Sequence, residues 1–204
     1  MDGLQGNLPD TAIILLILFF VLAVLTVILK SFKSIGPTEI GLVNKKFSFS
    51  KLKDDNPIAF NGEAGYQEEL LMPGLRFKLW PVYNIEKHPW VQVPAGEIGV
   101  VIAQVGDPIP MGSKSAVYKK EFGNFLHVKE FINLGGQKGV QRPVLPPGSL
   151  LPIHPVGFLV ITKKRVYGMP ITPELRELSL KKGGDLSPQA FGLDPSELNV
   201  VLIE

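Results

Sequence analysis

A run of nineteen residues without a charge, from Thr11 to Leu29, constrains this chain more than any other feature of its sequence. A helix of that length rises about 28 Å, close to the ~30 Å of hydrocarbon in a bilayer, and it pairs its own backbone polar groups. Thr11 and Thr26 alone interrupt the apolar surface, so the polar stripe of a soluble core helix is absent. We therefore predict a transmembrane helix over residues 11–29. Its membrane-spanning residues are taken to include Thr11, Ala12, Ile13, Leu16, Phe19, Phe20, Leu25 and Leu29.

A cleaved signal peptide is the main alternative for such a run. It would have basic residues before an apolar stretch of roughly 7 to 15 residues, and a small-residue cleavage site after it. Here Asp2 and Asp10 precede the run without any Lys or Arg, and Lys30 and Lys33 follow it. These flanks favour a retained anchor, with Lys30 and Lys33 as basic residues at the membrane interface.

The charge asymmetry around the run predicts its orientation. Basic residues begin only at Lys30, and Lys and Arg near a span usually stay on the cytoplasmic side. We predict a single-pass protein of the plasma membrane, with residues 1–10 outside the cytoplasm and the C-terminal domain inside it.

Composition excludes several function classes. The chain has no Cys, which removes disulfides, thiolate metal sites and catalytic thiols. All 21 basic residues lie beyond the run, against 17 of the 19 acidic ones. This mild excess suits an anionic leaflet and is too scattered to indicate nucleic acid. Membrane lipid is therefore the expected partner.

No pattern typical of catalysis or of a cofactor site occurs in the sequence. His88, His127 and His154 are too far apart to form a metal-ligand pair by spacing, and serine nucleophile elbows are absent. We expect a packing or hydrogen-bonding role for His154, which lies between Ile153 and Pro155. The prediction is a protein that is not an enzyme and needs neither a metal nor a cofactor.

The region after the run contains two similar segments. Glu39-Ile40-Gly41 recurs as Glu97-Ile98-Gly99, 58 positions later, and residues 62–82 align without gaps on residues 136–156, 74 positions later. Eight aligned positions of the longer match are identical: Gly62/Gly136, Gly65/Gly139, Gln67/Gln141, Leu71/Leu145, Pro73/Pro147, Gly74/Gly148, Pro81/Pro155 and Val82/Val156. Chance similarity between two Gly- and Pro-rich segments is the alternative, and the matching order of the residues argues against it.

The fold class predicted from this pattern is mainly β with one N-terminal transmembrane helix. Pro followed by Gly fits the centre of a type II turn, and short apolar segments flank each pair. We predict two tandem small β units, residues 34–92 and 93–167, with strands at 69–72, 75–80, 143–145, 150–153 and 157–162.

The second unit holds an extra 16 residues, within which apolar side chains recur at helical spacing. This predicts a helical insertion at about 113–133, as one amphipathic helix over 116–131 capped by Ser113 or Ser115 and weakened near Gly123. Residues 168–204 are predicted to form a linker, a short helix from Thr172 and a final strand at 199–203. We expect that strand to lead into a longer protein.

Several of these segments resemble the stomatin, prohibitin and flotillin superfamily, known as SPFH or Band 7, and in particular its bacterial flotillin-like members. The resemblance covers the anchor to about Tyr167. It depends on the anchor followed by the Glu-Ile-Gly strand and on three later segments, Leu134 to Gln141, Leu145 to Gly148 and Ile153 to Pro155.

The resemblance implies a membrane-attached SPFH domain at the front of the protein, assembly into large oligomers, and scaffolding of membrane microdomains or of associated membrane proteases. Family members assemble largely through a later coiled coil that these 204 residues lack, so the homo-oligomer is expected to form partly through regions beyond this chain. Two other functions remain open: an exported adaptor subunit of a transport or secretion machine, and a regulatory subunit of a membrane protease.

Overall fold

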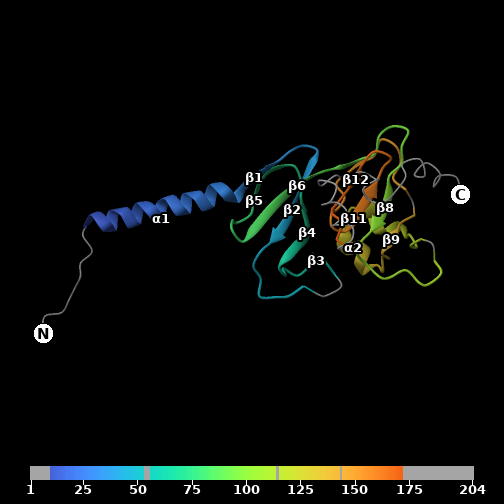
Figure 1. Cartoon of the computed structure of the whole chain (residues 1–204), viewed down its shortest axis with the longest axis horizontal. Coiled ribbons are helices and arrows are strands. Elements are labelled where there is room, and N and C mark those ends of the chain that lie inside the picture. The colour runs from blue at the N-terminus through green and yellow to red at the C-terminus, as the bar shows by residue number, and fades with distance from the viewer. Residues whose placement is uncertain (1–9, 53–55, 114, 143, 172–204) are drawn as a thin grey trace, which may run out of the picture.

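The predicted mainly-β fold with one long N-terminal helix is confirmed. A computed structural model describes residues 10–52, 56–113, 115–142 and 144–171. The chain begins with helix α1 (Asp10–Ser31), which projects from one end of a β domain (Figure 1). Predictions for residues 1–9 and 172–204, including the short helix from Thr172 and the final strand, lie outside the described residues.

The half of the domain next to α1 is built from two small sheets. Strand β1 (Phe32–Ile35) continues directly from α1 and pairs antiparallel with β5 (Gly74–Phe77). A four-stranded sheet follows in the spatial order β3-β4-β2-β6. Its strands are β2 (Glu39–Lys45), β3 (Ile58–Ala59), β4 (Gly65–Leu71) and β6 (Tyr83–Pro89).

The other half also combines a two-stranded and a four-stranded sheet. Strand β7 (Val91–Gln92) pairs antiparallel with β10 (Leu150–Leu151). The four-stranded sheet has the order β12-β11-β8-β9. Its strands are β8 (Val100–Ala103), β9 (Gly139–Val140), β11 (Phe158–Ile161) and β12 (Val166–Tyr167). Strand β11 agrees with the strand predicted at 157–162.

Strand pairs recur in the two halves at the offsets seen in the sequence. In the first half, β2 faces β4 through the pairs Gly41–Leu71 and Lys45–Gly65. The residues 58 and 74 positions later form the pairs Gly99–Leu145 and Ala103–Gly139. Both halves therefore place these residues in the same antiparallel register.

One side-chain arrangement recurs in the same way. The amide nitrogen of Gln67 donates to two backbone carbonyls, four and two residues earlier in the chain, each at 2.9 Å. The amide nitrogen of Gln141 donates to the carbonyls at the same two relative positions, at 2.7 and 2.9 Å. In both halves, this bond pattern closes the turn that leads into the strand.

The helical insertion differs from the prediction of a single helix. It forms a 3-10 helix, η1 (Lys120–Phe125), and a short α-helix, α2 (Val128–Asn133). Gly123 and Phe125 take positive φ angles of 59° and 64°, which a continuous right-handed helix does not allow. The predicted capping by serine is also wrong, because Lys119 and His127 occupy the two N-cap positions without a capping side-chain bond.

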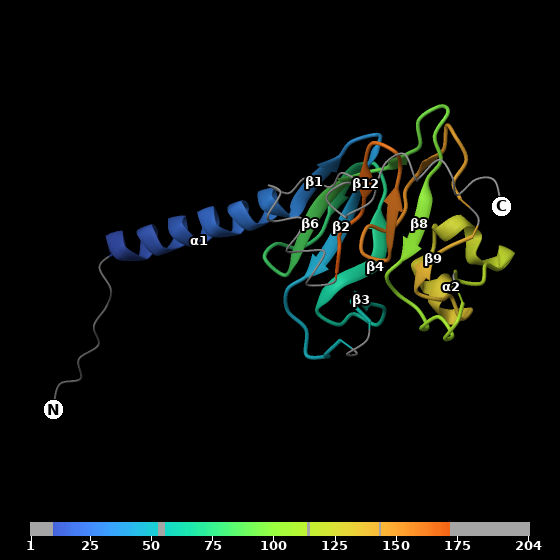
Figure 2. The ribbon, with the colours of Figure 1, turned by 45° about the vertical axis from the view of Figure 1, so that its right-hand side comes forward.

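The two four-stranded sheets share one hydrophobic core. Leu42 and Ile58 from the first half pack with Val101 and Val160 from the second. The insertion supplies Phe122, Phe125 and Phe131, whose rings contact one another and Phe158 at centroid distances of 4.9–6.1 Å. Figure 2 shows the two sheets side by side, with α2 at the end of the domain away from α1. A smaller second cluster joins Ile35, Val43, Leu71 and Ile85 beneath β1 and β5.

Candidate functional site

Helix α1 presents its apolar surface to its surroundings along its whole length. Residues 11–31 have a mean hydropathy of 3.4 in their most apolar window, and none of that window is buried by the rest of the chain. All eight residues predicted to span the membrane lie on α1; Ala12 is half-buried and the other seven are exposed: Thr11, Ile13, Leu16, Phe19, Phe20, Leu25 and Leu29. The helix is therefore long and apolar enough to cross a membrane, a property that signal sequences share.

The exposure of these side chains argues against a helix of a soluble core. Burying one Leu or Phe side chain is worth about 1.5–3 kcal/mol, so a helix with this many exposed apolar residues is stable only in a nonaqueous environment or against a partner. Within the described residues, no β element covers α1 beyond its last turn (Figure 1).

Ser31 fixes the end of α1 to the β domain. Its hydroxyl donates to the carbonyl of Val27 at 2.6 Å and accepts the backbone N–H of Trp80 at 3.0 Å. Its carbonyl accepts the N–H of Lys78 at 3.1 Å, and the residue is completely buried. These bonds join the helix to the segment after β5, so the domain is held at the end of α1 without a free linker.

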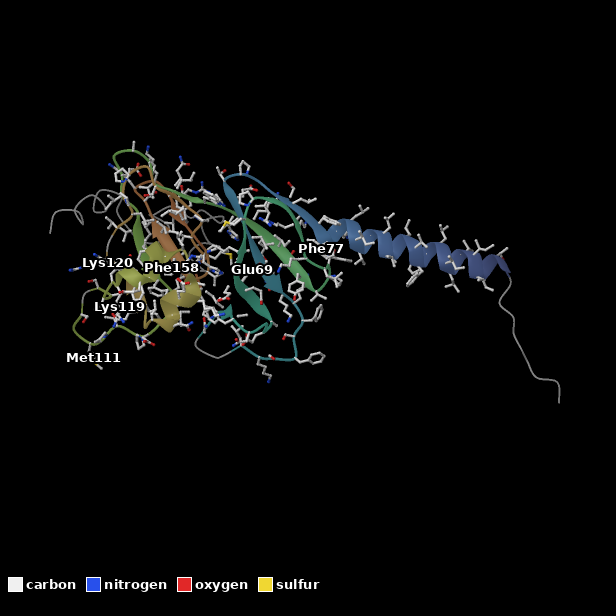
Figure 3. The ribbon with its side chains drawn as sticks, turned by 180° about the vertical axis from the view of Figure 1, so that it is seen from behind. Glu69, Phe77, Met111, Lys119, Lys120 and Phe158 are labelled. Carbon is white, nitrogen blue, oxygen red and sulfur yellow. The ribbon has the colours of Figure 1, made fainter. Side chains whose placement is uncertain are left out.

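Aromatic and basic side chains surround this junction. Lys30 lies 4.7 Å from the centre of the Trp80 ring, a cation–π distance. Phe32 and Phe77 face each other across β1 and β5 with ring centroids 5.2 Å apart, and Phe77 remains 54% exposed. Figure 3 shows Phe77 beside the base of α1. Tryptophan and basic residues are typical of the membrane–water interface, where amphipathic side chains collect.

The two predicted interface lysines come together around a hollow of about 260 Å³. Lys30 extends from α1 and Lys33 from β1, and both line the hollow together with Lys78, Trp80 and Tyr83. Lys78 also forms an ion pair with Glu69 at 3.1 Å. Three lysines that line one hollow at the end of an apolar helix suit the phosphate of a lipid headgroup.

We call the side chains around this hollow, together with Phe77 beside them, the collar: Lys30, Lys33, Lys78, Trp80, Tyr83 and Phe77. The sequence predicted only Lys30 and Lys33 of this group. Trp80 and Tyr83 are brought to α1 by the pairing of β5 with β1, and no periodicity relates them to the apolar run. The sequence signal that could have found this contact is the presence of a tryptophan at position 80, at the end of a short apolar segment within the aligned residues 62–82.

His154 connects the two halves of the domain. Its Nδ1 accepts the backbone N–H groups of Val156 and Gly157 at 3.2 and 3.1 Å, so the proton must sit on Nε2. Nε2 then donates to the carbonyl of Gln67 in β4 at 3.1 Å. Burial lowers the pKa of His154 to about 4, so the ring is neutral at physiological pH. The expected hydrogen-bonding role of His154 is thus confirmed.

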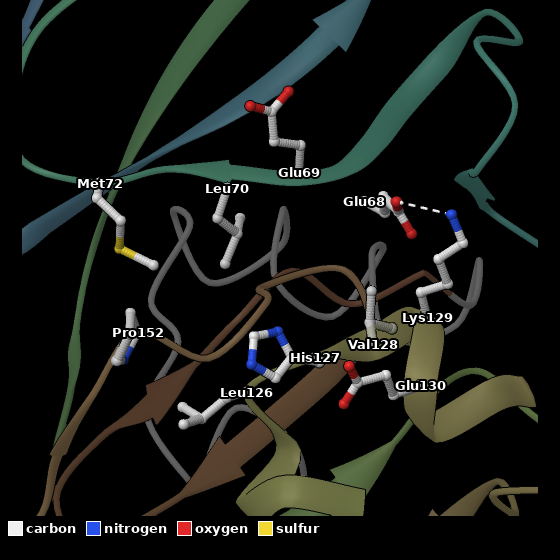
Figure 4. A pocket seen from close by; sticks show the side chains of 10 residues that line it. All are labelled: Glu68, Glu69, Leu70, Met72, Leu126, His127, Val128, Lys129, Glu130 and Pro152. Carbon is white, nitrogen blue, oxygen red and sulfur yellow. Dashed lines mark hydrogen bonds and ion pairs between the residues drawn. The ribbon is translucent and has the colours of Figure 1, made fainter. Parts of the chain in front are cut away.

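A second concave region separates β4 from α2. This cleft of about 460 Å³ is lined by Glu68, Glu69 and Glu130 together with His127 and Lys129 (Figure 4). Lys129 and Glu68 pair across it at 3.2 Å. Across the described part of the chain, no three His, Asp or Glu side chains are grouped to hold a metal ion. Because this ion pair joins β4 to α2, the cleft is part of the contact between the two halves of the domain.

Comparison of the chain with protein-family models, with curated proteins and with solved structures finds no match.

Proposed function

We propose that this protein is a non-enzymatic, membrane-anchored scaffold whose β domain is fixed at the membrane surface. The observation that carries the proposal is α1, an apolar helix exposed along its length and bonded at its end to the β domain through Ser31. In this proposal α1 spans the bilayer through the eight residues named above. The collar lies among the headgroups.

The proposed orientation places the β domain in the cytoplasm. It is supported by the absence of basic residues before Lys30 and by the three lysines gathered at the collar. A reporter fused to the C-terminus should be active in the cytoplasm. Activity only outside it would reverse the orientation, and it would favour the exported adaptor of a transport or secretion machine.

We further propose that the domain consists of two tandem units, residues 34–92 and 93–167, built on one plan. The support is the shared register of β2 with β4 and of β8 with the region from β9 to Leu145. The matching bonds of Gln67 and Gln141 add a second, independent likeness. The helical insertion belongs to the second unit, in which it supplies three phenylalanines to the core.

A scaffold gathers membrane only when several copies act together, so self-association is part of the proposal. The resemblance to the SPFH superfamily and its bacterial flotillin-like members remains a prediction, as do microdomains and a membrane protease as clients. The test is the native mass of the full-length protein after extraction in a mild detergent. We expect an oligomer, and a uniformly monomeric protein would contradict the scaffold.

A further inference from the structure

The segment that follows β2 carries two exposed aromatic rings. Phe47 is 65% exposed and Phe49 is fully exposed, although both lie within the domain sequence and outside α1. Single exposed apolar residues are common on soluble proteins, but two neighbouring phenylalanines with their rings in solvent are a candidate binding surface.

Hydrogen bonds hold the backbone around these rings in place. The N–H of Lys46 donates to the carbonyl of Val82 at 2.9 Å. The hydroxyl of Ser48 and the ammonium group of Lys45 both donate to the carbonyl of Gly62, at 3.0 and 2.6 Å. Ser48 is thus tied inward, while the rings of Phe47 and Phe49 on either side of it are exposed.

The segment lies on the side of the domain from which α1 emerges. In Figures 1 and 2, the chain that follows β2 turns at the lower corner of the domain, on the side from which α1 emerges, and Figure 1 labels β5 on the same side. The opposite end of the domain is marked by Met111, which is also fully exposed (Figure 3). A bilayer crossed by α1 would therefore lie close to the segment after β2 and would be remote from Met111.

The charges around the two rings suit an anionic membrane surface. Residues 45–51 include Lys45, Lys46 and Lys51 and no acidic residue. Lys46 and Lys51 are exposed, and Lys45 lines a shallow hollow with Ser48 and both rings. Aromatic side chains that insert among headgroups while lysines contact lipid phosphates form a common kind of peripheral membrane contact.

We propose that residues 46–51 form a second membrane contact, in which Phe47 and Phe49 insert into the leaflet at which α1 ends and the lysines bind anionic lipid headgroups. This inference rests on the proposed function, since it requires α1 to span the bilayer. Two contacts on one rigid domain would fix its rotation about the axis of α1. Neighbouring copies would then present the same faces to one another.

The experiment exploits the absence of Cys, which allows one label at a chosen position of the full-length chain. Phe49→Cys, Met111→Cys and Leu18→Cys variants carry an environment-sensitive fluorophore and are reconstituted into vesicles of phosphatidylcholine with one quarter phosphatidylglycerol. Lipids bearing a nitroxide near the headgroup or in the acyl chain quench labels that reach them. We expect strong quenching at positions 18 and 49 and none at position 111.

The label at position 18 separates the two hypotheses. Quenching at 18 together with a label at 49 that is as unquenched as that at 111 would overturn the second contact and leave the anchor standing. An unquenched label at 18 would overturn both.

The composition of the vesicle tests the lysines and the occupant. Removing phosphatidylglycerol should weaken quenching at position 49 and leave position 18 unchanged. Adding Lys46→Gln and Lys51→Gln to the Phe49→Cys variant should abolish this dependence on anionic lipid. If the label at position 49 were shielded from water in native membranes but not in vesicles that contain this protein alone, the surface would bind a protein partner. That result would contradict the proposal.

Discussion

Trp80 and His154 occupy matching positions in the two halves of the domain, yet they meet opposite environments. Trp80 is half-buried beneath the ammonium group of Lys30 at the base of α1. His154 is buried to 1% exposure and bonds to the other half through Gln67. The comparison shows that aligned positions of the two halves serve different ends: one lies at the junction with α1 and the other joins the two halves.

The helical insertion accounts for a second difference between the halves. In the second half, Phe122, Phe125 and Phe131 pack beside Phe158, so the main core contains a cluster of aromatic rings. Beneath β1 and β5, the smaller cluster contains only aliphatic buried side chains. Stability should therefore depend strongly on the aromatic rings that the second half adds to the shared core.

The largest expected effect comes from the aromatic core. Phe131→Ala removes a fully buried ring that contacts three other phenylalanines, which should lower the free energy of unfolding by about 3–5 kcal/mol. The matched change Phe77→Ala, on an exposed ring beside α1, should cost about 1 kcal/mol or less. Denaturant unfolding in detergent micelles measures both values, and equal losses would contradict the central place of the aromatic cluster in the core.

The next effect is a dependence of stability on pH through His154. Its pKa is about 4 in the folded chain, against 6.5 for an unperturbed His, because burial disfavours the charged ring. The stabilisation is fully present above pH 6.5 and is lost as the pH falls towards 4, because only the unfolded state binds the proton in that window. The loss should amount to about 3 kcal/mol over that range.

The control for this titration is His154→Gln, which should be less stable at neutral pH and show a shallower pH dependence. His88 contributes in the same direction, since burial also lowers its pKa. If the free energy of unfolding of the His154→Gln variant depended on pH as steeply as before, the titrating group would be His88. That result would contradict the proposed role of His154 in joining the two halves.

The general architecture was predictable from the sequence because it depends on local signals. The apolar run defines α1, and the recurring Gly and Pro residues located the turns around β4 and β5. The collar was not predictable, since Trp80 reaches Lys30 only through the pairing of β1 with β5. The insertion was misread as one helix because Phe125 fits the helical spacing of apolar residues, while its backbone takes a positive φ angle that spacing does not reveal. Its ring contacts Tyr118, Phe131 and Phe158.

A smaller effect tests the likeness of the two units directly. Gln141 is buried and Gln67 is half-buried, and each closes the same turn with two bonds to backbone carbonyls. Replacing Gln141 by Ala should cost about 2 kcal/mol, and replacing Gln67 by Ala should cost about 1 kcal/mol, since water can reach the carbonyls left behind at the more exposed site. A loss at only one position would show that the bonds are not equivalent, and it would weaken the proposed duplication.

The smallest effect concerns the joint between α1 and the domain. Ser31→Ala removes the acceptor of the Trp80 N–H and should cost about 1 kcal/mol of stability. Its sharper readout is motion: a nitroxide label at position 33, next to the joint, should become more mobile in the variant. Ser113→Ala, at an exposed position close in sequence to Met111 and so away from α1, provides the control. Unchanged mobility at position 33 would mean that Ser31 does not hold the domain in place.

The central claim is that α1 is a retained membrane anchor, and the intact mass of the chain in alkali-washed membranes tests it most directly. Alkaline washing releases peripheral proteins and secreted chains and leaves spanning proteins in the pellet. The account predicts that the pellet contains a chain that still includes residues 10–31. A chain released into the supernatant, or one shortened by cleavage beyond α1, would contradict it.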